Sequence, residues 1–324
     1  MAEIEKLTVV PLHWCDVPDE NQPKIDLGFG FSIERLRKFL DSADLGVWKW
    51  KGSREPDEID RWDLCLVHRY ESSEVIGEME QKSITQLGYI LGHLRLINPH
   101  RDSTDDCIQL SRQADRSFSG FSCSKANFRP NRFLTDCENL CCSVNAGHIA
   151  TLKQWMPWII EFAANWRDFY PFYLSLFFLE KGCVDTDFRT RHLFRVMSLE
   201  ALLSSDGDFG RKAFKSKLPK LLGWHTDLYK PYSVDFFPLP ELLLTDLLLD
   251  DIYTLRNRIA HADVLPEQWI SEIKRPGLNE PISYAAQLTE AAASMARLSW
   301  LRILSENLQK TFANKKSMET FFRN

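Results

Sequence analysis

Long apolar runs are missing from this sequence of 324 residues. The two densest, PFYLSLFFL and ELLLTDLLL, fall well short of the roughly 20 apolar residues that cross a bilayer. The first twenty residues lack the basic region, apolar stretch and small-residue cleavage site of a secretory signal. We therefore expect a soluble, cytoplasmic protein whose eight cysteines are reduced thiols rather than a disulfide framework.

A glycine-rich phosphate loop and a strong net charge are also absent. The segment DLGFGFS has two glycines two positions apart but lacks the third that a dinucleotide-binding loop requires. The net charge of −5 gives no global signature of a nucleic-acid-binding protein, although a local basic face can still bind RNA. The sequence contains no internal repeat and no low-complexity segment.

Metal-binding motifs are weak. Four cysteines and one histidine occur close enough in the chain to suggest zinc: Cys123, Cys137, Cys141, Cys142 and His148. CENLCC has the spacing Cys-x3-Cys, at the loose end of zinc-ligand spacings, and no second tight pair accompanies it. Buried free thiols explain these cysteines better than zinc does, and we expect no metal or cofactor.

Hydrophobic residues, by contrast, make up 44% of the chain and include 21 Phe and 10 Trp, enough to bury a large core. Residues 1–148 mix two strand patterns (7–14 and 64–70) with two helix patterns (31–43 and 83–97). Polar, turn-rich sequence follows from Asn98 to about Asn131. We predict a small α+β region of unknown role over residues 1–148.

Helical periodicity dominates from about residue 150. One apolar face recurs in steps of four and three residues, formed by Trp155, Ile159, Phe162, Trp166 and Phe169, and Pro171 is expected to end that helix. Further helices are predicted over 173–182, 189–205, 212–223, 239–263 and 283–310. The fold class is therefore mainly α, with an all-helical domain over residues 149–324.

The segment TLRNRIAHAD, residues 254 to 263, places polar residues in a helix that packs into the core. At 100° per residue, Arg256, Asn257 and His261 flank a stripe centred on Tyr253 and Ala260. Asn257 and His261 are four residues apart and are expected to share a face. A small residue among polar ones lets another helix approach closely.

Glu200 falls in the apolar face of the helix predicted over 189–205. A carboxylate in that position is costly unless it is paired and hydrogen-bonded. We expect Arg256 to be its partner, with Asn257 or Arg258 as alternatives. In a simpler interpretation, Glu200 sits at a helix edge and reaches water.

These two segments together resemble the HEPN superfamily of small helical bundles. Its signature is an Arg, four to six residues and a His, often with Asn directly after the Arg, and Arg256, Asn257 and His261 match it with four intervening residues. LEALLSS, residues 199–205, is similar to the LEALL helix of HEPN proteins in bacterial abortive-infection and toxin systems. The resemblance covers about residues 165–310.

The resemblance implies a metal-independent endoribonuclease in which two protomers bring their Arg and His side chains into one cleft. The chemistry is reasonable because RNA carries its own nucleophile, the ribose 2′-OH. His261 can take that proton or give one to the leaving oxygen, and Arg256 can oppose the charge that builds on the phosphate. Asn257 can orient the imidazole or bind a phosphate oxygen. One such His per chain favours a homodimer.

The resemblance also implies a setting: anti-phage defence or a toxin system, with RNA and a regulatory or antitoxin protein as partners and no membrane. The N-terminal region would then sense a trigger or restrain activity. The alternative is a non-catalytic HEPN-like module that dimerises or binds RNA without cutting it. In that case Arg256 and Glu200 are a structural ion pair and His261 is a surface histidine.

A basic segment between residues 189 and 220 is a candidate RNA-backbone track, with eight Lys or Arg against three Asp or Glu. The residues expected to contact RNA are Arg189, Arg191, Arg195, Arg211, Lys212 and Lys215, with Arg258 from the later helix. A solvated helix face explains the same pattern equally well.

Overall fold

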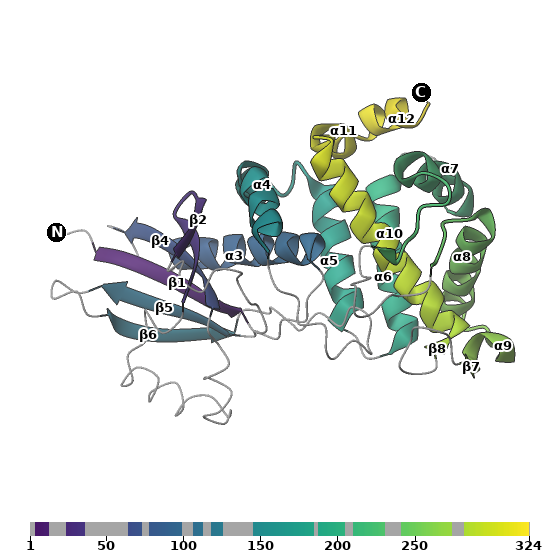
Figure 1. The fold of residues 1–324 in the computed structure, drawn as a ribbon, viewed down its shortest axis with the longest axis horizontal. Coiled ribbons are helices and arrows are strands. Elements are labelled where there is room, and N and C mark those ends of the chain that lie inside the picture. Colours follow the sequence, from purple (N-terminus) through teal and green to yellow (C-terminus); the bar gives the residue numbers. More distant parts are fainter. Residues whose placement is uncertain are drawn as a thin grey trace. The chain divides into compact units, whose positions relative to one another are not determined.

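The computed structural model describes residues 4–12, 24–35, 64–72, 78–98, 106–112, 118–125, 145–184, 187–204, 210–230, 241–273 and 282–323. The described residues divide into two compact units, unit 1 up to Ala164 and unit 2 from Asn165 onward. The protein is mainly α, with an α+β N-terminal region (Figure 1). None of the described helices combines the length and apolar character needed to span a bilayer.

Unit 1 contains a six-stranded sheet in which all neighbouring strands are antiparallel, in the order β2-β3-β4-β1-β5-β6. Its strands are β1 (Ile4–Leu12), β2 (Lys24–Gly28), β3 (Phe31–Arg35), β4 (Leu64–Ser72), β5 (Asp106–Arg112) and β6 (Phe118–Lys125). The strand predictions over 7–14 and 64–70 are confirmed by β1 and β4, which pair along their full lengths.

The helix predicted over 31–43 is wrong where the structure describes it, because Phe31–Arg35 is strand β3. Its first four residues are all buried, so a run that looks like one helix face is a strand enclosed on both sides. The paired glycines that resembled part of a phosphate loop form the β2–β3 turn, with positive φ at Gly28 and Gly30. At Gly30 a Cβ would also approach the carbonyl oxygen of Arg69 to 2.6 Å.

The turn-rich segment predicted from Asn98 to Asn131 also differs from the structure, since β5 and β6 form within it. β5 hydrogen-bonds to β1, a partner about a hundred residues earlier in the chain. Strands at one end of an antiparallel sheet can be largely polar, and their pairing comes from the backbone of distant residues. Local composition therefore did not reveal them.

The described residues of unit 1 also form two helices: α3 (Glu78–Ile97), which confirms the predicted helix, and α4 (Ala146–Ala164). Trp158 of α4 donates its Nε1–H to Nε2 of His93 over 3.3 Å, and His93 Nδ1 lies 2.7 Å from the Tyr89 carbonyl. Burial lowers the pKa of His93 to about 4, so the ring stays neutral and bridges the two helices. The predicted domain boundary at residue 148 falls inside α4, which belongs to unit 1.

Pro171 does not end α4. That helix stops at Ala164, and Pro171 lies in the first turn of the next helix, where its missing N–H would have no helical partner. Of the predicted apolar face, Trp155, Ile159 and Phe162 are buried in unit 1, whereas Trp166 follows the end of α4 and is only partly buried.

The described part of unit 2 is mainly helical and includes the two-stranded ribbon β7 (Glu272–Ile273) and β8 (Ile282–Ser283) and an isolated bridge between Asp227 and Leu243. Its helices are α5 (Tyr170–Val184), α6 (Phe188–Leu203), α7 (Arg211–Leu222), α8 (Asp246–Ala260), α9 (Glu267–Ile270), α10 (Tyr284–Ser305), α11 (Gln309–Ala313) and α12 (Lys315–Arg323). The helix predicted from residue 239 begins only at Asp246, because Thr245 accepts a hydrogen bond from Leu248 N–H and caps it.

A fully buried ion pair holds unit 2 together. Arg195 of α6 lies 2.7 Å from Glu290 of α10 and also donates to the carbonyl oxygens of Gly182 on α5 and Thr289 on α10. A Cβ at Gly182 would come within 2.8 Å of the Arg195 side chain, so this position in α5 requires glycine. The prediction that Arg195 contacts RNA is wrong, since its side chain has no exposed surface.

Acid should destabilise unit 2 through His192, whose Nε2–H donates to the carbonyl oxygen of Ile252 over 2.9 Å. Burial lowers the pKa of His192 from 6.5 to about 4, so the unfolded chain binds a proton that the folded unit does not. The stability present above pH 6.5 is therefore lost as the pH falls towards 4. We expect His192→Gln, whose amide keeps the donor, to show a smaller fall in urea midpoint across this interval.

His261→Gln, which removes an exposed histidine from the same unit, is the matched control for that measurement. The unfolding midpoints are read by circular dichroism at several pH values. The same pH dependence in His192→Gln as in the wild type would show that the buried ring does not couple unfolding to protons.

Candidate functional site

Glu200 and Arg256 meet where α6 packs against α8. Arg256 Nη2 lies 3.6 Å from Glu200 Oε2, which confirms the predicted pairing. Tyr253 donates its hydroxyl to the other carboxylate oxygen of Glu200 over 3.1 Å. The Glu200 side chain is 22% exposed, so it sits at the edge of the helix contact, as the simpler interpretation also expected.

Tyr253 is the residue of this cluster to which sequence reasoning gave no chemical role. Its ring is 6% exposed and lies beneath two guanidinium groups, 5.6 Å from Arg256 and 5.9 Å from Arg211. Burial first, and then the negative charge of Glu200, raise the pKa of Tyr253, so its hydroxyl remains a donor. In the sequence, the only signal of a role for Tyr253 is its position on the helix stripe beside Arg256.

The guanidinium of Arg256 is held on two sides. Besides Glu200, it reaches Asn257, whose side-chain oxygen accepts from Nη1 over 3.2 Å. Its Nε is buried and has no hydrogen-bond partner among the described residues. The structure thus brings Arg256, Asn257 and Glu200 together and leaves one buried donor of the Arg256 fork unsatisfied.

His261 lies at the same end of α8 but outside the helix, as its C-cap residue. The chain then turns through Ala262, which has φ of 57°, and Asp263 N–H bonds back to the Arg258 carbonyl over 2.7 Å. This is the six-to-one bond of a Schellman motif. His261 is exposed, and its imidazole makes no hydrogen bond within the described part of the chain, so only the backbone bond from His261 N–H to Asn257 links it to the cluster.

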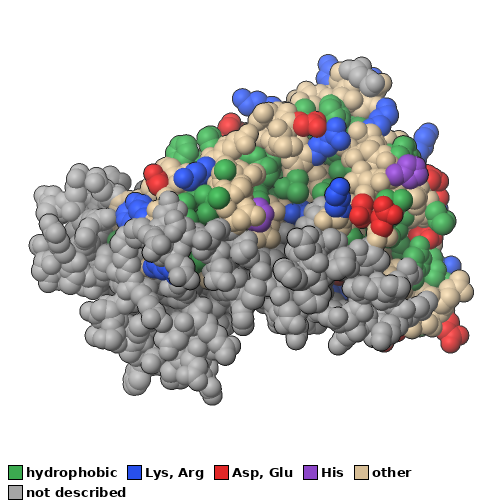
Figure 2. All heavy atoms as spheres, viewed as in Figure 1, with side chains coloured by type: hydrophobic (Ala, Val, Ile, Leu, Met, Phe, Trp, Pro, Cys, Tyr) green, Lys and Arg blue, Asp and Glu red, His purple; other side chains and the backbone are tan. Residues whose placement is uncertain are grey.

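The predicted RNA track does not appear as one exposed basic surface in the described residues. Arg211 pairs with Asp250 at 3.7 Å, and Lys215 pairs with Asp246 at 2.8 Å and with Asp250 at 2.6 Å. The hydrogen bonds to Asp246 and then Asp250 raise the pKa of Lys215. On the face shown in Figure 2, basic and acidic side chains alternate rather than gather by sign.

The other predicted RNA contacts have different environments. Arg258 donates to the carbonyl oxygen of Val264 over 3.0 Å, and Arg191 is half-buried. Arg189 and Lys212 are exposed and make no ion pair with a described carboxylate. Lys212 lines an open hollow of about 530 Å³ together with Arg211, Lys215 and Ser216 of α7.

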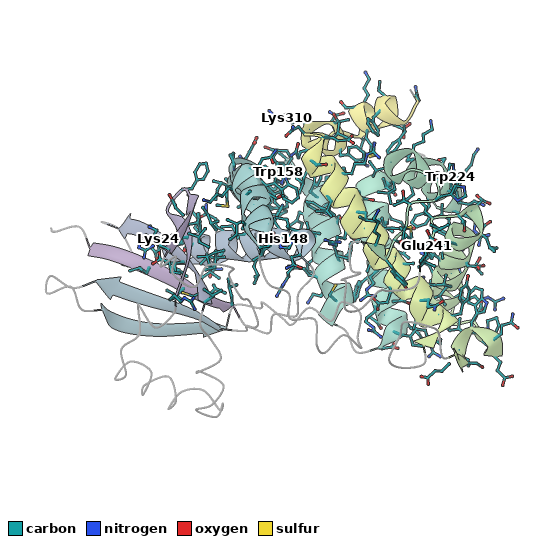
Figure 3. All side chains as sticks on the ribbon, in the orientation of Figure 1. Lys24, His148, Trp158, Trp224, Glu241 and Lys310 are labelled. Atoms are coloured by element: carbon teal, nitrogen blue, oxygen red, sulfur yellow. The ribbon has the colours of Figure 1, made fainter. Side chains whose placement is uncertain are left out.

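The described residues contain no group of three or more His, Cys, Asp or Glu placed to hold a metal. Of the cysteines considered for zinc, none has a described side chain. His148, labelled in Figure 3, lies in the first turn of α4, where its N–H donates to the side-chain oxygen of Asn145 over 2.9 Å. Cys65 and Cys183 are buried cysteines, and the Cys65 thiol donates to the carbonyl oxygen of Glu34 over 3.3 Å.

Comparison with known proteins finds no match to a family model, to a curated protein or to a solved structure.

The double variant Arg256→Ala/Glu200→Ala should lose less unfolding free energy than the two single variants lose in sum. Arg256→Ala leaves the half-buried carboxylate without its cation, and Glu200→Ala does the reverse. We expect a coupling free energy of about 1 kcal/mol in a double-mutant cycle followed by urea unfolding. Arg258→Ala combined with Glu200→Ala is the control pair, because Arg258 bonds to Val264. Equal coupling in both cycles would contradict the ion pair.

Ala262→Gly should stabilise unit 2 by about 1 kcal/mol, because a left-handed residue at the end of a helix favours glycine. Ala260→Gly is the matched control, and its effect on stability should have the opposite sign. Ala260 is the last residue of α8, and glycine in a helix should destabilise the fold by about 0.5 kcal/mol. Thermal unfolding of both variants checks this. A lower melting temperature for Ala262→Gly would contradict the assigned turn.

Proposed function

We propose that unit 2 is a HEPN-like endoribonuclease domain that cuts RNA without a metal, through Arg256, Asn257 and His261 of two protomers. One observation carries the proposal: the end of α8 presents a guanidinium held in place and, at the cap position, an exposed imidazole with no hydrogen bond to a described residue. The resemblance of the two sequence segments to the HEPN superfamily supports the same assignment.

Each group has a task in this chemistry. His261 takes the proton from the ribose 2′-OH in one protomer, and its counterpart gives a proton to the leaving 5′-oxygen. Arg256 opposes the charge that accumulates on the phosphate. Arg256 lies 3.6 Å from Glu200, which is longer than the distance in a close ion pair, and its buried Nε–H makes no hydrogen bond to a described residue. Both features suit a guanidinium that exchanges the carboxylate of Glu200 for a phosphate of RNA.

Tyr253 and Glu200 act through Arg256. The Tyr253 hydroxyl bonds to Glu200, and the tyrosine ring lies beneath the guanidinium, so together they limit where Arg256 can point. A homodimer with twofold symmetry is part of the proposal, because acid and base roles need two imidazoles. Unit 1 then senses a trigger or restrains the nuclease, in a defence or toxin system of the cytoplasm.

A specific observation favours the second candidate, a non-catalytic module. The basic residues closest to Tyr253 are paired with carboxylates, Arg256 with Glu200 and Arg211 with Asp250. In that case the cluster stabilises the helix packing and His261 is a surface residue. The two candidates differ in whether RNA is cut.

The proposed nuclease should cleave labelled RNA in the presence of EDTA and leave 2′,3′-cyclic phosphate ends. His261→Ala should reduce the rate by about 10²- to 10⁴-fold, the usual range for a lost acid–base group, without lowering the melting temperature. His225→Asn is the matched control: His225 is another exposed histidine of unit 2, and asparagine tolerates its φ of 61°.

Full activity in His261→Ala, or a strict requirement for a divalent metal, would refute the nuclease. A dimer that binds RNA without cutting it, and whose affinity is unchanged by His261→Ala, would instead establish the non-catalytic module.

A further inference from the structure

Four aromatic side chains cluster on one side of α5 and the turn before it: Tyr170, Tyr173 and Phe177 lie in a row along the helix, and Trp166 packs beside Tyr170 and Tyr173. We refer to these four residues as the aromatic ladder. The Trp166 ring centroid lies 6.2 Å from that of Tyr170 and 4.7 Å from that of Tyr173, and the row along the helix has 6.0 Å from Tyr170 to Tyr173 and 6.3 Å from Tyr173 to Phe177. The three rings of the row are nearly parallel, with interplanar angles of 22° and 21°.

Two of the four ladder residues, Tyr170 and Phe177, are exposed to solvent, and Trp166 and Tyr173 are partly buried. Tyr170 is 48% exposed and Phe177 is 41% exposed, whereas Phe172 and Leu176 on the opposite side of α5 are buried. A helix that is apolar on both sides normally has both sides covered. An exposed row of large aromatic side chains therefore indicates a surface that binds something.

A cation lies over each of two rings of the ladder. The Arg167 guanidinium is 5.3 Å from the Trp166 ring, and the Lys181 ammonium is 5.6 Å from the Phe177 ring. Neither makes an ion pair with a described carboxylate. Several other basic residues of unit 2 are paired with carboxylates, namely Arg195, Arg211, Lys215 and Arg256. Positive charge without a described counter-charge thus coincides with the aromatic row.

We propose that the aromatic ladder is a stacking platform for the unpaired bases of single-stranded RNA, with Arg167 and Lys181 binding its phosphates. Every base has a flat face that stacks on an aromatic ring, and flanking cations follow the backbone. From Tyr170 to Lys181 the helix rises about 16 Å at 1.5 Å per residue, which is room for several nucleotides. Arg189, exposed at the start of α6 and lying 5.6 Å over the Phe188 ring, extends the positive charge beyond Lys181.

Single-stranded RNA fits this surface better than a duplex does, because bases inside a duplex are already stacked between neighbouring base pairs and have no free face for an aromatic side chain. The choice of RNA as the ligand rests on the proposed function. The ladder adds that this RNA is single-stranded. The ladder and the end of α8 share none of their residues, so binding and cutting can be tested separately.

Binding is measured on the full chain carrying His261→Ala, so that RNA is not consumed. A labelled 12-nucleotide strand of mixed sequence, alone or annealed to its complement, is titrated by fluorescence anisotropy. We expect the single strand to bind more tightly than the duplex. Tyr170→Leu and Phe177→Leu should each raise Kd about tenfold, because leucine keeps the apolar area but removes the ring, whereas Tyr170→Phe should bind like the parent.

Two further variants separate stacking from charge. Lys181→Ala should reduce the slope of log affinity against log salt by about 0.7, the value for one phosphate contact on a single strand. Trp224→Leu is the control for an exposed aromatic outside the ladder, since Trp224 is 49% exposed after α7 and is labelled in Figure 3. Its Kd should equal that of the parent.

Unchanged Kd in both leucine variants, or equal affinity for strand and duplex, would overturn the platform. So would leucine variants that lose self-association, or the binding of a protein, while keeping their RNA affinity, because the ladder would then be a protein interface. Binding through the ladder by a wild-type protein that never cuts RNA would refute only the nuclease. Cleavage with no contribution from the ladder would refute only the platform.

Discussion

The buried ion pair between Arg195 and Glu290 is the constraint on which unit 2 depends. Removing two charges from water is expensive, and it succeeds here because Arg195 also donates to two carbonyl oxygens. Those bonds join α5, α6 and α10 and set the rotation of α6. Glu200 is five residues further on, 140° around the helix at 100° per residue, and there it meets α8. The core ion pair and the site cluster thus share one helix.

Charge in unit 2 is arranged in two ways. Around Tyr253 the cations meet carboxylates, which positions side chains but leaves little net field for a polyanion. On α5 and in the turn before it, Lys181 and Arg167 lie over aromatic rings instead. If both proposals hold, the end of α8 carries the chemistry and α5 provides much of the affinity.

Much of the architecture was predictable from local pattern. Strands β1 and β4 and most of the long helices follow from apolar periodicity, and the pairing of Glu200 with Arg256 followed from the cost of a half-buried carboxylate. The strand at Phe31–Arg35 was not predictable, because a short apolar run enclosed on both sides has no distinguishing period. Strands β5 and β6 were missed because their partners are distant backbone atoms.

The sequence by itself determined the mainly helical character of the chain, the N-terminal α+β mixture and the grouping of Arg256, Asn257 and His261 within six residues, because these depend on neighbours along the chain. Only the tertiary structure decided that Arg195 is a core residue, that His261 leaves α8 at its cap and that Tyr170 and Phe177 of the aromatic ladder stay exposed. Burial and charge pairing are set by helices far apart in sequence, and no local pattern records which of them will meet.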